Sequence, residues 1–135
     1  MKLGIVGLSQ SGKTTIFNAL TNSTLPTGAG SSSGQFEIHT AVVNVPDARV
    51  EKLKAMFNPK KTTYTQVTYV DIGGLEKGIG EGGLKGEFRN QLAQLDGFLH
   101  VVRAFKDENV PLPYETIDPQ RDVEILDGEF LLTDL

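Results

Sequence analysis

The 135-residue sequence predicts one α/β domain built on a mostly parallel sheet. Apolar, β-branched segments alternate along it with segments whose apolar residues recur at helical spacing, which is typical of strands and helices stacked in layers. A chain of this length with 39% hydrophobic residues can bury a single core. Glycine-rich turns follow two of the expected strands, at the position where open α/β sheets bind their ligands.

The first expected element is a strand at residues 2–7, followed by a glycine-bounded turn and a helix that begins at Lys13. Three apolar residues of that helix recur at helical spacing: Ile16, Phe17 and Leu20. The next stretch, residues 22–35, is rich in Gly, Ser, Thr and Pro. It has little to bury, so it predicts a mobile loop or a linker.

A strand is expected over residues 36–45, followed by a helix with Asp47 as its N-cap and Pro59 as its stop signal. The apolar residues of this helix form one stripe: Val50, Leu53 and Phe57. A second buried strand is expected at residues 65–71. It leads into residues 72–86, where seven glycines argue against a settled helix or strand.

The last third of the chain predicts two more helices around one strand. Residues 87–97 are expected to form a helix closed by Gly97, and residues 98–105 a continuous apolar strand buried on both faces. Residues 118–135 have the pattern of a capped helix. With the earlier segments, this order gives a three-layer α/β sandwich.

The sequence "GLSQSGKT", residues 7–14, satisfies the pattern G-x-x-x-x-G-K-S/T of a phosphate-binding loop. Gly7 and Gly12 allow the backbone to turn its N–H groups toward phosphate oxygens, and the following helix presents its N-terminus to the same anion. In such a loop Lys13 reaches the β and γ phosphates and the Thr14 hydroxyl coordinates Mg²⁺. The alternative is a chance glycine turn before a helix, but the position between a strand and a helix favours the phosphate loop.

A second motif follows the strand at residues 65–71, where Asp71 and Gly74 form the pattern D-x-x-G. Asp71 is expected to hold Mg²⁺ through water, and the Gly74 amide to sense a γ-phosphate, as in phosphate-loop NTPases. A strand that ends in Asp is often only a capped turn. The motif gains weight because it is paired with a phosphate loop.

Four stretches together carry a family resemblance: "GLSQSGKT", "VDIGGLEKG", "GFLHVVRAF" and "DPQRDVEILDGEFLLTDL". On these, the chain resembles the G domain of the Obg-like P-loop NTPases of the TRAFAC class, specifically the YchF branch, over residues 1–135. The resemblance implies a fold that binds GTP or ATP with Mg²⁺, hydrolyses the nucleotide slowly and acts near the ribosome in translation or stress responses. An enzyme of the GTPase or ATPase type is therefore expected.

The resemblance also assigns roles to single residues. It implies that Lys13 and Leu75 are the catalytic positions and that Thr14 and Asp71 bind the metal. The residues expected to bind the nucleotide are Ser9, Gln10, Ser11, Gly12, Lys13, Thr14, Thr15 and Gly74. Residues 23–38 correspond to a mobile switch I-like loop, and residues 72–86 to a glycine-rich switch II-like loop.

Leu75 lies where many related GTPases have a Gln that orients the attacking water. A leucine has neither donor nor acceptor, so slow intrinsic turnover is expected, with the water positioned by another group, a bound partner or a cation. Leu75 can also be an ordinary apolar anchor of its loop. The rival function is a nucleotide-binding module with little or no hydrolysis, acting as a degenerate switch or interaction domain.

Two departures from the family concern switch I and the end of the chain. The alignment puts Gln35 where the family has a Thr that closes onto Mg²⁺, and a rearranged loop would be needed for a substitute from Ser31, Ser32, Ser33 or Thr40. The chain also ends after one helix beyond residue 105, before the family's base-recognition motif. The sequence therefore predicts a partial G domain with a sheet incomplete at its C-terminal edge, and it leaves the choice between GTP and ATP open.

Charge and composition set the expected partners. The net charge of −4 does not favour DNA, no apolar run has the length of a membrane span, and the lack of cysteine fits a cytoplasmic protein. The ribosome or its RNA is the expected partner, through two sets of basic residues: Lys52, Lys54, Lys60 and Lys61, or Lys77, Lys85 and Arg89. For the first set, a solvated helix face is the more frequent explanation. The second set is the better candidate for a partner surface, because the glycine-rich loop is expected to respond to nucleotide. A P-loop kinase is a weaker alternative, because only Arg103 and Arg121 follow residue 97 as candidates for an arginine-rich lid.

Overall fold

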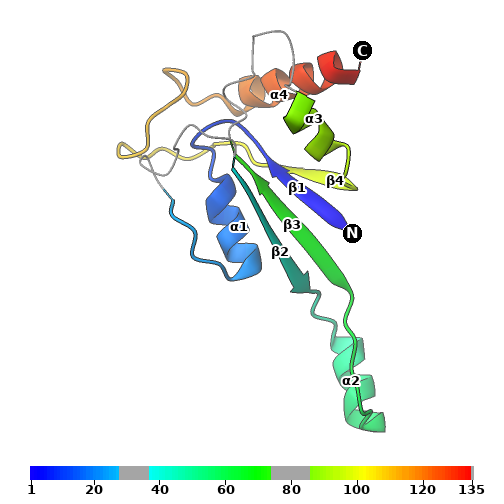
Figure 1. The fold of residues 1–135 in the computed structure, drawn as a ribbon. Coiled ribbons are helices and arrows are strands. Elements are labelled where there is room, and N and C mark those ends of the chain that lie inside the picture. Colours follow the sequence, from blue (N-terminus) through cyan, green and yellow to red (C-terminus); the bar gives the residue numbers. More distant parts are fainter. Residues whose placement is uncertain (28–36, 74–85, 135) are drawn as a thin grey trace.

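The computed structural model describes residues 1–27, 37–73 and 86–134, and it confirms the predicted α/β class. Its sheet has the strand order β2-β3-β1-β4 (Figure 1). Three neighbouring strands, β3, β1 and β4, are parallel, and β2 runs antiparallel to β3. The strands are β1 (Lys2–Val6), β2 (Ile38–Asn44), β3 (Gln66–Ile72) and β4 (Gly97–His100), and the helices are α1 (Lys13–Thr21), α2 (Ala48–Phe57), α3 (Gly86–Leu92) and α4 (Pro119–Asp134).

The strand register brings the carboxyl ends of the parallel strands together. In β1, Ile5 lies opposite Asp71 of β3 and opposite Leu99 of β4, and Val6 lies opposite His100. Chain segments that leave these strand ends therefore start at one edge of the sheet. This is the edge at which open α/β sheets bind ligands.

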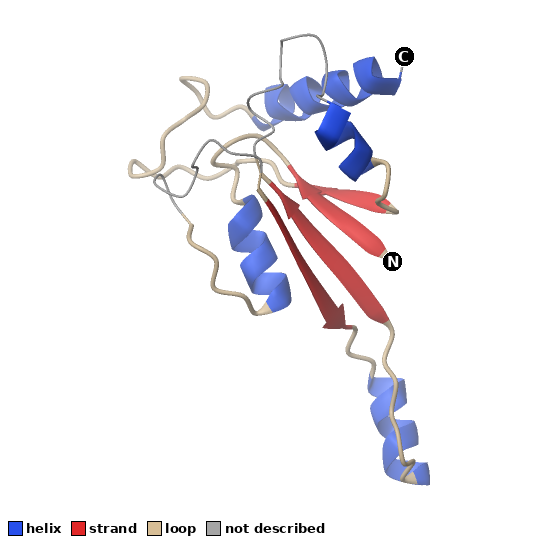
Figure 2. Cartoon of the chain, in the orientation of Figure 1, coloured by secondary structure: helices blue, strands red, loops and turns tan. Residues whose placement is uncertain are grey.

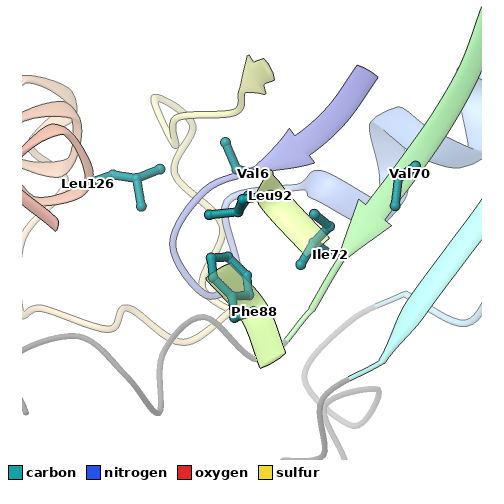
Figure 3. Close-up of a cluster of buried hydrophobic side chains, with 6 residues drawn as sticks. All are labelled: Val6, Val70, Ile72, Phe88, Leu92 and Leu126. Atoms are coloured by element: carbon teal, nitrogen blue, oxygen red, sulfur yellow. The ribbon is translucent and has the colours of Figure 1, made fainter. Parts of the chain in front are cut away.

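The core lies between the sheet and two helices. Figure 3 shows six buried side chains that meet there: Val6, Val70, Ile72, Phe88, Leu92 and Leu126. They come from β1, β3, α3 and α4. Because successive side chains of a strand point to opposite faces, Ile5 and Asp71 belong to the other face, where α1 packs. The result is the predicted arrangement of three layers.

Helix α1 buries only part of its apolar stripe. Phe17 is among the most completely buried side chains of the protein, whereas Ile16 and Leu20 are exposed. The helix is short and contacts β3, β2 and β1, and the side that carries Phe17 faces these strands. The predicted helix is confirmed, and one of its three regularly spaced apolar residues is buried.

Helix α3 ends earlier than predicted. It stops at Leu92, and the amides of residues 93–95 donate backbone hydrogen bonds to carbonyls of residues 89–92. The Asp96 amide already donates to the Lys2 carbonyl, at 2.8 Å. Gly97 is the first residue of β4 and pairs with Leu3, so it does not cap the helix. Gly97 joins the sheet because it pairs with β1. The helical pattern of residues 87–97 gives no information about a contact with a strand so far away in the sequence.

The predicted long strand at residues 98–105 was also wrong, because β4 ends at His100 and Phe98 is exposed. Beyond it, the buried guanidinium of Arg103 gathers a loop. It donates hydrogen bonds of 2.8–3.4 Å to four backbone carbonyls: those of Phe105, Asp107, Val110 and Pro111. These bonds fold the chain back on itself, because a buried guanidinium needs its donors satisfied.

The helix caps agree with the sequence. The Asp47 side chain accepts a hydrogen bond of 2.9 Å from the Arg49 amide at the start of α2, and Asp118 accepts one of 3.1 Å from the Arg121 amide in α4. Asn58 ends α2 in a left-handed conformation. Helix α2 itself projects from the sheet at the end of the β2–β3 pair (Figures 1 and 2), and this helix, described over its whole length, has no buried residue. The predicted stripe of α2 therefore faces solvent.

Candidate phosphate-binding site

The loop between β1 and α1 is held close to the end of β4. The Val101 amide donates a hydrogen bond of 2.8 Å to the Val6 carbonyl, which continues the pairing of the strands. A Cβ on Gly7 would lie 2.3 Å from the Val101 carbonyl oxygen, so only glycine fits there. Gly12 has a φ of 99° and Gln10 a φ of 60°, values at which the chain can curl into a tight loop. The backbone thus forms the turn that the motif predicts.

Helix α1 presents its N-terminus to this loop. Its N-cap is Gly12, and no side chain in the described part of the protein caps it. The first turn contains no acidic residue. The first amides of a helix lack partners within the helix and carry a partial positive charge. This end of α1 is therefore suited to bind an anion that approaches the loop.

Lys13 lies against the loop with its side chain folded inward. It is 8% exposed, and its Nζ donates a hydrogen bond of 2.8 Å to the Leu8 carbonyl oxygen. A buried ammonium group needs such a partner because removal from water is costly. The bond keeps the positive charge at the loop, where phosphate oxygens can replace the carbonyl.

Thr14 and Asp71 meet across the interface of α1 and β3. The Thr14 hydroxyl donates a hydrogen bond of 2.8 Å to Oδ2 of Asp71, which is 3% exposed. Neither the other carboxylate oxygen, Oδ1, nor the buried Ser11 hydroxyl has a hydrogen-bond partner among the residues that the structure describes. A buried polar atom in this state calls for a water or an ion. Hydroxyl and carboxylate oxygens are the ligands that Mg²⁺ prefers, so this pair fits the metal.

The remaining predicted site residues are divided between the surface of the loop and undescribed segments. Ser9 and Gln10 are half-buried in the loop, and Thr15 is exposed on α1. Gly74, Leu75 and Gln35 lie outside the described residues. The same is true of Ser31, Ser32, Ser33, Lys77 and Lys85.

The first predicted switch segment leads into β2, and the second follows β3. Glu37, just before β2, and Gly73, just after β3, are joined by a hydrogen bond of 2.9 Å from the Gly73 amide to the Glu37 carbonyl. At the other end of the first segment, the Asn18 side chain forms hydrogen bonds of 2.9 and 3.1 Å with the Leu25 carbonyl and amide. Residues 23–25, the first part of the predicted mobile loop at residues 23–38, are therefore anchored to α1. Residues 28–36 of that loop lie outside the described residues.

Two backbone groups take part that the sequence did not reveal. The Leu8 carbonyl accepts from Lys13, and the Val101 carbonyl restricts position 7 to glycine. Leu8 occupies a variable position of the motif, so its carbonyl has no sequence signal. Within residues 1–27, 37–73 and 86–134, no group of three or more His, Cys, Asp or Glu side chains could hold a metal. In the same ranges, no helix is long and apolar enough to cross a membrane.

Comparisons with known proteins agree with this geometry. The 50S ribosome-binding GTPase family matches residues 2–127. The chain is 40% identical over 136 residues to the ribosome-binding ATPase YchF of Bacillus subtilis, covering 98% of this chain and 36% of that protein. It is 37% identical over 140 residues to the protein of the same name from Escherichia coli O157:H7, covering 99% of this chain and 37% of that protein.

A solved structure matches as well. The YchF GTPase of Schizosaccharomyces pombe superposes with a TM-score of 0.71 at 36% identity, over 99% of this chain and 36% of that one. The chain thus spans little more than a third of the length of these relatives. The resemblance to YchF proteins, predicted from the sequence, is confirmed. The chain belongs to the 50S ribosome-binding GTPase family.

Proposed function

We propose that this domain binds GTP or ATP with Mg²⁺, hydrolyses it slowly, and acts with the ribosome in the cytoplasm. The observation that carries the proposal is the contact of Thr14 with the buried Asp71 beside the inward-folded Lys13. A chance glycine turn would not need a buried lysine and a buried carboxylate at the same strand ends. The names of the relatives, ribosome-binding ATPase and YchF GTPase, support both the nucleotide and the ribosomal partner.

Each residue of the site has a physical task in this function. The loop amides and the N-terminus of α1 bind the phosphates, and the Nζ of Lys13 moves from the Leu8 carbonyl to the β and γ phosphate oxygens. Thr14 and Asp71 would hold Mg²⁺, which neutralises charge on the β and γ phosphates when it is bound.

Hydrolysis requires a water in line with the bond that breaks. The water oxygen bonds to the γ-phosphorus, the bond to the bridging oxygen breaks, and the proton of the water passes to the released phosphate. Leu75 offers no group that orients this water, so we expect slow turnover. Leu75 and Gln35 together favour the second candidate, a module that binds nucleotide with little or no hydrolysis.

A kinase function has less support. A phosphate-transferring lid needs arginines that are free to reach the phosphates, and Arg103 is buried with its guanidinium on four backbone carbonyls. Arg121 forms an ion pair with Asp122, in which Nη2 lies 2.8 Å from Oδ1. Both arginines therefore stabilise the fold of residues 101–122.

Nucleotide titration with Lys13→Ala tests the binding site. Loss of charge-assisted hydrogen bonds, each contributing about 1.5–3 kcal/mol, should weaken ATP or GTP binding at least about tenfold. The control is Lys54→Ala, because that residue lies on α2, far from the loop. Equal nucleotide affinity of Lys13→Ala and wild type would refute the site.

Phosphate release at saturating ATP or GTP separates the two candidate functions. Slow release that becomes faster in Leu75→Gln supports a hydrolysing switch whose water is poorly positioned. Tight binding with no phosphate release, in both wild type and Leu75→Gln, supports the binding module. Fast release by wild type with no partner present would contradict the role given to Leu75.

A further inference from the structure

Helix α2 and its flanks form a projecting surface, residues 47–61, which we call the α2 tip. Leu53, Met56 and Phe57 are 54%, 70% and 72% exposed, although they follow helical spacing on one side of the helix. Figure 2 shows the helix standing beyond the sheet, away from α1, α3 and α4. The α2 tip thus exposes an apolar stripe that no described part of the chain covers.

The charge of the α2 tip is opposite to that of the rest of the protein. Its fifteen residues contain five basic and two acidic side chains, whereas the remaining residues contain eight basic and fifteen acidic ones. A chain with a net charge of −4 therefore carries a local surplus of positive charge at its most projecting point. This separation allows the tip to approach a polyanion while the acidic body stays at a distance.

The acidic side chains of the tip are already partnered. Asp47 pairs with Arg49, whose Nη2 lies 2.8 Å from Oδ2, and the pair lowers the pKa of Asp47. Glu51 accepts a hydrogen bond from the Tyr64 hydroxyl. Four other side chains of the tip make no ion pair with any carboxylate in the described ranges: Lys52, Lys54, Lys60 and Lys61. Their charges are available to a partner.

The lysines surround the apolar stripe. With 3.6 residues per turn, Lys52 and Lys54 fall on either side of it, and Lys60 and Lys61 follow the end of the helix. An apolar protein groove that covered the stripe would also remove these lysines from water, which is unfavourable. An RNA strand suits the pattern better, because lysines bind phosphates while an exposed aromatic ring stacks on an unpaired base.

We infer that the α2 tip docks on RNA, with the lysines at the phosphates and Phe57 stacked on a base. The inference rests on the proposed function, since it assigns the surface through which this domain contacts the ribosome. It is distinct from the nucleotide site, which lies at the opposite end of the β2–β3 pair (Figure 1).

The first test asks whether the lysines of the α2 tip contact phosphates. It measures binding of purified, protein-free ribosomal RNA from the large subunit at several salt concentrations. In the double variant Lys52→Ala and Lys54→Ala, the slope of log affinity against log salt should fall by about 1.4. Affinity at about 0.1 M salt should then fall roughly 25-fold. The matched control, Lys2→Ala with Lys106→Ala, removes two lysines outside the tip and should keep the wild-type slope.

Phe57→Ala tests the stacking contact. Its affinity for the same RNA should fall roughly tenfold with no change of salt slope, because stacking releases no counterions. Leu131→Ala removes a similarly exposed apolar residue from α4, 65% exposed against 72% for Phe57, and should have no effect. If the tip variants bind this RNA as tightly as wild type does, the inference is overturned. It is also overturned if poly-L-glutamate binds in a tip-dependent manner and the RNA does not, which would point to an acidic protein partner.

ATP and GTP titration of the same variants separates this inference from the proposed function. The tip variants should bind nucleotide like wild type, and Lys13→Ala should bind the RNA like wild type. Loss of the tip effect with intact nucleotide binding would overturn only the docking surface. A wild-type chain that binds no nucleotide, but binds RNA through the tip, would overturn only the nucleotide function.

Discussion

The two ends of the β2–β3 pair are built in opposite ways. At one end, Asp71 is buried and bonded to Thr14, and Gly73 is bonded to Glu37. At the other end, α2 is held by its own caps and buries no side chain along its fully described length. A carboxylate is thus buried at the first end, and apolar side chains are exposed to water at the second. Each arrangement lowers the stability of the fold, so we expect each end to bind a ligand or a partner.

The largest expected difference between the two ends is in stability. Phe17→Ala removes a buried ring between α1 and the sheet and should lower the free energy of unfolding by about 3–5 kcal/mol. Phe57→Ala removes a ring that is mostly in water and should change it by less than about 0.5 kcal/mol. Urea unfolding of both variants measures this. A comparable loss for Phe57→Ala would mean that α2 packs against the body in solution.

A smaller effect is expected from the glycine at the start of the phosphate loop. A Cβ on Gly7 would collide with the Val101 carbonyl, a backbone atom that cannot rotate away, so Gly7→Ala should cost about 1–3 kcal/mol. Gly128→Ala is the matched control, because an added Cβ in α4 meets nothing within 4 Å. That change should leave stability equal or slightly higher, since alanine favours helix. Equal unfolding midpoints for the two variants would contradict the tight packing of the loop against β4.

The smallest expected effect concerns pH and the far side of the sheet. Burial lowers the pKa of His100 below its ordinary value of 6.5, and the nearby carboxylates of Asp127 and Asp122 partly oppose this shift. The unfolded chain then binds a proton more readily than the folded one. His100 should therefore cost no stability well above pH 6.5, and a penalty should develop as the pH falls from there through the lowered folded-state pKa.

His100→Gln should flatten that part of the pH dependence. Urea unfolding of wild type and variant at pH 7.5 and pH 5 gives the comparison, and wild type should lose more stability between the two values. A loss of the same size in both proteins would show that His100 is not responsible. Far-UV circular dichroism of the variant at pH 7.5 checks that the fold is intact.

Residues with local signals could be read from the sequence. The phosphate loop and the cap at Asp47 depend on short spacings. The expectation that Thr14 and Asp71 share a site comes from pairing the loop motif with the D-x-x-G motif, although the two residues are 57 positions apart. The structure places these residues as expected. Their roles in binding and hydrolysis remain predictions.

Features set by distant contacts could not be read in this way. Gly97 joins the sheet because it pairs with Leu3. Beyond the end of β4, the Arg103 guanidinium binds carbonyls further along the chain. The stripe on α2 has the same period as a buried one, and nothing local tells which surface, if any, covers it. Periodicity identifies an apolar face, whereas its partner depends on the whole fold.

The central claim is that Thr14 and Asp71 form the metal-binding half of a nucleotide site. Titration of wild type with ATP and with GTP, in the presence and absence of Mg²⁺, tests it most directly. We expect Mg²⁺ to raise the affinity for at least one nucleotide, and Asp71→Asn and Thr14→Ala to reduce that gain roughly 10- to 100-fold. Thr14→Ser, which keeps the hydroxyl, should retain most of it. An affinity that does not respond to Mg²⁺ in wild type, or that responds equally in all four proteins, would contradict the account.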